Sequence, residues 1–197
     1  AESSDGGTNE SEQRLADPNQ DGDTTDQAST SDGAVSLAGA VVVSIYLPET
    51  MAYIDTAGSV TTIGDIAVTA TALETVTSVA DASNTGSGST GVGVAVAFGW
   101  TESSVSTYLG GTGRLDAGNI NLTSTLDADN TYKVEAISGI GDGSKTGIAG
   151  SLAINVAQSN VEAYIDSGAS LNLNGSNLSI SAISDTSTIT NAIPHED

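Results

Sequence analysis

Residues 147–166 read GIAGSLAINVAQSNVEAYID, and this stretch decides the fold class. Leu152, Ile154 and Val156 alternate along it with the small or polar residues Ala153 and Asn155. A period of two is typical of a β-strand, because successive side chains point to opposite faces of a sheet. The stretch therefore predicts a long strand with one buried face.

Two further copies of this stretch precede it, at residues 36–55 and 91–110. Tyr53, Tyr108 and Tyr164 recur at the same place in each copy, at spacings of 55 and 56 residues. The segments that follow also correspond, at residues 65–71, 119–125 and 177–183, and each precedes another alternating stretch. A fixed period of this length indicates a repeat protein. We expect a β domain over residues 33–197, with repeats of about 33–90, 91–146 and 147–197.

The second copy shows the alternation in its strictest form. Val92, Val94 and Val96, followed by Phe98 and Trp100, form one set, and the residues between them are glycine or alanine. We expect the set with large side chains to be the buried one, with its two aromatic residues in a core or an interface. The small residues on the other face would let a second sheet or chain approach closely.

Composition supports an all-β chain and excludes several partners. Aromatic residues make up 4% of the chain, which has 23 glycines, 3 prolines and no cysteine. Its 25 acidic residues against 4 basic ones give a net charge of −21. Four scattered cations cannot form the basic surface that nucleic acid or an anionic membrane needs. No apolar run is long enough for a transmembrane helix, so we expect no transmembrane segment.

Residues 1–32 differ from the rest, because they are acidic and almost devoid of apolar side chains. Oxygen-bearing residues stand here at the spacing of a calcium loop, with Gly22 at the turn. The candidate Ca²⁺ ligands are Asp17, Asn19, Asp21, Asp23 and Asp26. The twelfth position of the loop holds Ala28 in place of the glutamate of an EF-hand, so the segment resembles the shorter loops of thrombospondin type 3 repeats and dockerins. The alternatives are an acidic linker and an arm that binds a neighbouring subunit.

No set of residues predicts catalysis. Most remaining aspartates fall in predicted turns, where the side chain bonds nearby backbone amides. A polysaccharide-acting enzyme would need two carboxylates at a defined separation, and the sequence selects no such pair. His195 is the only histidine, which excludes a zinc site built from histidine and cysteine. We expect the three repeated tyrosines to anchor packing at the repeat edges, with a carbohydrate-binding stack as the alternative.

The pattern of residues 147–169, followed by the alternating stretch 171–182, resembles the repeats of large bacterial filamentous-haemagglutinin-like adhesins and related exoproteins. Those repeats combine a small-residue strand with an Ala-Tyr-Ile turn, which appears here as Ala163-Tyr164-Ile165. The second copy departs from the motif at residues 107–113. The resemblance implies a right-handed parallel β-helix or β-solenoid, secreted or at the cell surface, without catalytic residues. A β-sandwich pilin joined by donor-strand exchange is the alternative fold.

These features predict a structural subunit of an extracellular filament or surface assembly, not an enzyme. An array with uncapped ends exposes strand edges that can pair with other copies of the chain. Calcium would stabilise such an assembly. The alternative is a fragment of an adhesin that binds a surface or a cell-surface glycan.

Overall fold

The computed structural model describes residues 35–83, 89–140 and 144–195, and every regular element in these ranges is a β-strand. The first repeat contains β1 (Val35–Tyr46), β2 (Glu49–Asp55), β3 (Ser59–Thr61), β4 (Ile66–Ala72) and β5 (Thr75–Ser83). The second contains β6 (Thr90–Gly110), β7 (Arg114–Asp116), β8 (Ile120–Leu126) and β9 (Thr131–Gly139). The third contains β10 (Thr146–Ile165), β11 (Ser170–Asn172), β12 (Leu178–Ser184) and β13 (Ser187–His195). The expected all-β class is confirmed.

Equivalent strands of the three repeats pair side by side in four sheets. Sheet A joins β1 and β2 to β6 and then β10, and sheet B joins β3, β7 and β11. Sheet C joins β4, β8 and β12, and sheet D joins β5, β9 and β13. All these pairings are parallel, which differs from the antiparallel sheets of an immunoglobulin-like sandwich. In each of the four sheets, the middle strand comes from the second repeat.

The first repeat interrupts its long strand at Pro48, which lies between β1 and β2. Proline has no backbone N–H to donate to a sheet. Its carbonyl still accepts from the amide of Ser104 at 3.0 Å, so β1 and β2 both follow β6 in one register.

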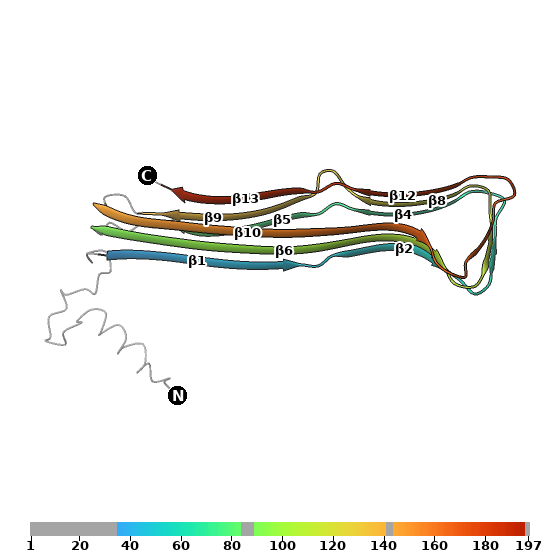
Figure 1. The fold of residues 1–197 in the computed structure, drawn as a ribbon, viewed down its shortest axis with the longest axis horizontal. Helices are drawn as coiled ribbons and strands as arrows, with labels where there is room; N and C mark the ends of the chain where they lie inside the picture. Colours follow the sequence, from blue (N-terminus) through green and yellow to red (C-terminus); the bar gives the residue numbers. More distant parts are fainter. Residues whose placement is uncertain (1–34, 84–88, 141–143, 196–197) are drawn as a thin grey trace, which may run out of the picture.

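Each repeat runs along one layer and returns along another. Sheet A forms the first layer, sheets C and D form the second, and the short strands of sheet B lie in the turn at the right of Figure 1. Clusters of buried side chains join sheet A to sheets C and D. Residues 84–88 and 141–143, which link one repeat to the next, lie outside the described residues.

Small side chains fill the space between sheets A and D. Ala95 and Ala97 of β6 are fully buried there and pack with Val134 and Ala136 of β9. A Cβ at Gly93 would overlap the carbonyl oxygen of Gly139. The two backbones therefore approach so closely that larger side chains are excluded.

This arrangement corrects the expected direction of the alternation in sheet A. The glycine and alanine face of β6 points into the interior, whereas Val92, Val94 and Val96 point outward. Phe98 and Trp100 lie on the same outer face and are half-buried, so they are not core residues. The period of two identified the strand correctly, but close packing of the layers, not hydrophobicity alone, decides which face is inside.

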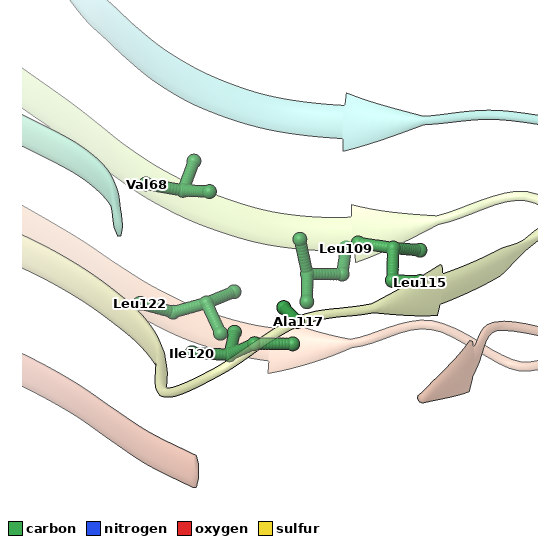
Figure 2. Packing of buried hydrophobic residues seen from close by; sticks show 6 residues of the cluster. All are labelled: Val68, Leu109, Leu115, Ala117, Ile120 and Leu122. Carbon is green, nitrogen blue, oxygen red and sulfur yellow. The ribbon is translucent and has the colours of Figure 1, made fainter. Parts of the chain in front are cut away.

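The interior holds larger side chains beside the turn. Leu109, Leu115, Ile120 and Leu122 are fully buried, and Val68 of the first repeat packs with them. Figure 2 shows these residues together with Ala117, which directly follows β7; the others come from β4, β6, β7 and β8. The hydrophobic core is therefore thickest beside sheet B and thin between sheets A and D.

Candidate functional surfaces

The third repeat leaves core positions uncovered, whereas Val68 of the first repeat, in register with Leu122, is only 8% exposed. Leu122, in the middle repeat, is 0% exposed, whereas its register partner Ile180 in β12 is 45% exposed. Ile120 and Leu178 show the same contrast, because the next strand is present on both sides of β8 and on one side of β12. Within the described residues, the first and third repeats present open strand edges, and exposed apolar core side chains flank the edge of the third.

Three tyrosines form a stack on the outer surface of sheet A. The ring centroids of Tyr53 and Tyr108 are 4.9 Å apart, and those of Tyr108 and Tyr164 are 5.3 Å apart. The rings are nearly parallel, at 4° and 11°. Burial raises the pKa of Tyr108 above its ordinary value, and Tyr53 and Asp55 nearby add to the increase. The expected packing role at the repeat edges is confirmed, and Tyr53 remains 54% exposed.

Side chains also join the repeats at the corner before sheet C. The Asp65 carboxylate accepts from both the backbone amide and the side-chain amide of Asn119, at 2.8 and 3.1 Å. The Asn119 side-chain oxygen accepts from the amide of Asn177 at 3.0 Å. These three residues start the corresponding segments of the three repeats, and Asp65 and Asn119 each hold the backbone of the next repeat in register.

A second polar contact lies in the turn at sheet B. Arg114 donates to Asp116 through two nitrogens, and Asn172 of the third repeat donates to the same carboxylate at 2.6 Å. Hydrogen bonds from Arg114 and Asn172 lower the pKa of Asp116. The carboxylate thus has a structural partner in its own repeat and in the next.

One carboxylate lies inside the protein. Glu74 is 5% exposed and accepts from the Ser103 hydroxyl at 2.8 Å and from the Tyr132 hydroxyl at 2.6 Å. Its backbone amide donates to the side-chain oxygen of the fully buried Asn130. Burial, together with the hydrogen bond to Glu74, raises the pKa of Tyr132. The cluster joins the first and second repeats across the core, and sequence analysis did not single out Glu74.

Several aspartates do what the sequence predicted for turn residues. Asp127 accepts from the amide of Asp129 at 3.0 Å. Asp166 accepts from the next amide in the chain at 2.7 Å. These carboxylates hold turns, and this use explains their positions without a catalytic role.

The predicted calcium ligands Asp17, Asn19, Asp21, Asp23 and Asp26 lie outside the described residues. In the ranges that are described, no three His, Asp or Glu side chains lie close enough together to hold a metal ion. No helix in those ranges is long and apolar enough to cross a membrane.

Comparison with family models, with curated proteins and with solved structures found no match. The resemblance to filamentous-haemagglutinin-like repeats therefore rests on the sequence pattern alone. The observations that bear on function are the open edges, the stacked tyrosines and the contacts that join successive repeats.

Proposed function

We propose that this chain is a non-catalytic structural segment of an extracellular filament or surface assembly, built as a β-solenoid whose repeats continue from one copy to the next. The observation that carries the proposal is the contrast between the closed core of the middle repeat and the open core of the third repeat. Ile180 is a core residue by register and a surface residue by exposure.

The physical basis is the unfinished pairing at each end. An edge strand has backbone N–H and C=O groups that can pair with another chain. Strands of successive repeats stack here in parallel with matching registers, so the first repeat of one copy fits the third repeat of another. Such a head-to-tail contact does not close on itself and generates a filament.

Calcium fits this proposal as a stabilising ion. A chain with a net charge of −21 repels its own copies, and a divalent cation reduces that repulsion. The oxygen-rich segment at residues 17–26 supplies ligands of the kind that Ca²⁺ prefers. A location at the cell surface or in the medium follows from the same role and from the resemblance.

The second candidate function is binding of a surface glycan by an adhesin fragment. The stacked tyrosines favour it, because their rings form a continuous and partly exposed aromatic row across the three repeats. Replacing Tyr53 with alanine removes the most exposed ring. Loss of glycan binding in Tyr53→Ala on a glycan array, with retention in Met51→Ala on the same strand, would favour this candidate.

The experiment for the main proposal is electron microscopy of the purified chain with millimolar calcium and with a chelator. We expect filaments in calcium that shorten or loosen on chelation. Ile180→Lys places a charge on the open end of the core and should abolish filaments, whereas Asn121→Lys, on the exposed outer face of β8 in the middle repeat, should retain them. Filaments that persist unchanged in Ile180→Lys would contradict assembly through this edge.

A further inference from the structure

The outer surface of sheet A contains a continuous apolar area, which we call the apolar face. It consists of every second residue from Leu37 to Ile45 on β1, from Val92 to Trp100 on β6 and from Ile148 to Val156 on β10. All these positions are aliphatic, aromatic or glycine. The parallel register places them in five rows across the three strands, such as the row Val41, Val96 and Leu152.

The apolar face is open to solvent in the single chain. Leu37 is 76% exposed, Val41 is 73% exposed and Leu152 is 51% exposed. The three strand segments 35–46, 90–101 and 146–157 contain no charged residue, although the chain has a net charge of −21. Soluble monomers rarely expose a contiguous apolar patch of more than a few hundred Å². The face therefore calls for a partner.

The size of the face fits pairing of two copies. Three strands about 4.8 Å apart, each contributing nine residues with a rise of about 3.3 Å, cover roughly 400–500 Å² as a flat surface. Pairing of two such faces hides about 800–1,000 Å² of flat surface from solvent. Because side chains make the real surface uneven, the buried area is larger and reaches the range of specific protein interfaces, about 1,200 Å² or more.

The shape of the face also fits a second copy. Val94 stands between Gly39 and Gly150 in one row, and a Cβ at either glycine would have no atom within 4 Å. The row thus has a projecting side chain in the middle and an open place on each side. Two identical faces can interlock there, because aliphatic side chains of one copy fill the open places of the other.

We propose that two copies of this chain associate through their apolar faces, sheet against sheet. This contact uses the surface of sheet A, whereas the filament contact proposed above uses the strand edges at the ends. The two contacts are independent, so a filament of this chain would consist of two rows of copies joined through their apolar faces.

The charges on sheet A select the direction of the pair. Beyond the apolar face, the same outer surface has the exposed carboxylates Glu49, Glu102 and Glu162. In a parallel pair these groups would face their counterparts across about 10 Å, the usual distance between packed sheets, which is near the Debye length of about 8 Å. An antiparallel pair separates them at opposite ends, and we infer this arrangement.

Sedimentation equilibrium of the chain tests the proposal, with a chelator present so that filaments do not interfere. We expect a reversible dimer whose dissociation constant rises at least tenfold in Val94→Lys. Val79→Lys is the matched control, because Val79 is 43% exposed and Val94 is 45% exposed, and both changes add the same charge. A wild-type chain that is monomeric at every concentration, or equal weakening by both variants, would overturn the proposal.

Spin labels test the direction. The chain has no cysteine, so Glu102→Cys provides a single labelling site. In the antiparallel pair the two labels lie about 40 Å apart, since each is six residues of about 3.3 Å beyond Val96 at the centre of the face. A distance near 10–15 Å would show a parallel pair and contradict the inferred direction. Ile180→Lys should leave the dimer intact, which separates this contact from the proposed filament.

Discussion

Gly93 and the carbonyl oxygen of Gly139 meet in the interior with no room for a side chain between them. Gly93 belongs to sheet A and Gly139 to sheet D, so this contact sets how closely the two layers approach. A Cβ at Gly93 would also lie 2.9 Å from the carbonyl oxygen of Ala82, so the glycine is enclosed by the backbone of two neighbouring repeats.

Gly93→Ala should therefore destabilise the chain. Overpacking of a close-packed core costs about 1–3 kcal/mol, and here the clash is with backbone that cannot rotate away. Gly150→Ala is the control, because a Cβ there meets open space and removes flexibility from the unfolded chain, for an effect within about 1 kcal/mol of zero. Urea unfolding followed by circular dichroism measures both. Equal stability of the two variants would show that the layers are farther apart.

Because the core is uncovered at the third repeat, alanine substitutions of Leu122 and Ile180 should reduce stability by different amounts. Leu122→Ala removes a fully buried side chain and should cost about 2–5 kcal/mol. Ile180→Ala, in the same row of the sheet, should cost clearly less in dilute protein, because that side chain is 45% exposed. At concentrations that favour assembly, the difference between the two should narrow. A large and concentration-independent loss for Ile180→Ala would show that the third repeat is covered within one chain.

Substitutions of Glu74 and Tyr132 should have non-additive effects on the free energy of unfolding, because the two side chains share a hydrogen bond. Tyr132→Phe removes the hydroxyl donor and leaves one buried carboxylate oxygen without that partner, for a loss of about 1–3 kcal/mol. Once Glu74 is replaced by leucine, which has no acceptor for the Tyr132 hydroxyl, Tyr132→Phe should cost less. A double-mutant cycle measured by urea unfolding should give a coupling of about 0.5–3 kcal/mol. Additive losses would contradict the contact.

Alkaline pH should weaken the fold through the same tyrosine. The pKa of Tyr132 is raised above its ordinary value of 10.0 by burial and by Glu74, so folding favours the neutral phenol. Stability from this group is fully present below pH 10 and is lost as pH rises toward the pKa of the folded state. Unfolding titrations from pH 8 to 11 should show a smaller decline in Tyr132→Phe than in the parent chain. Parallel declines would contradict the assignment.

The sequence predicted the repeats and the strands because each depends on local pattern. The spacing of Tyr53, Tyr108 and Tyr164 identified positions that lie side by side in sheet A, and their rings stack. The alignment of Asp65, Asn119 and Asn177 likewise identified one corner of each repeat, although not the hydrogen bonds between them.

Local pattern could not predict which face of a strand is buried or which side chains meet across the interior. Strict alternation of small and large residues is compatible with either face inside. The choice depends on the distance between the layers, which the approaches of Gly93 to Gly139 and of Gly99 to Val134 set from separate strands. Glu74 gave no signal, because a single acidic residue near a turn is ordinarily exposed. Its burial follows from Ser103 and Tyr132, which are distant in sequence.

Electron microscopy of the chain in millimolar calcium shows whether copies continue the repeat array end to end. We expect unbranched filaments whose diffraction contains a spacing of about 4.8 Å between strands along the axis. Ile180→Lys should abolish these filaments, and Asn121→Lys in the middle repeat should retain them. Single particles of one or two chains at all concentrations, with and without calcium, would contradict the claim.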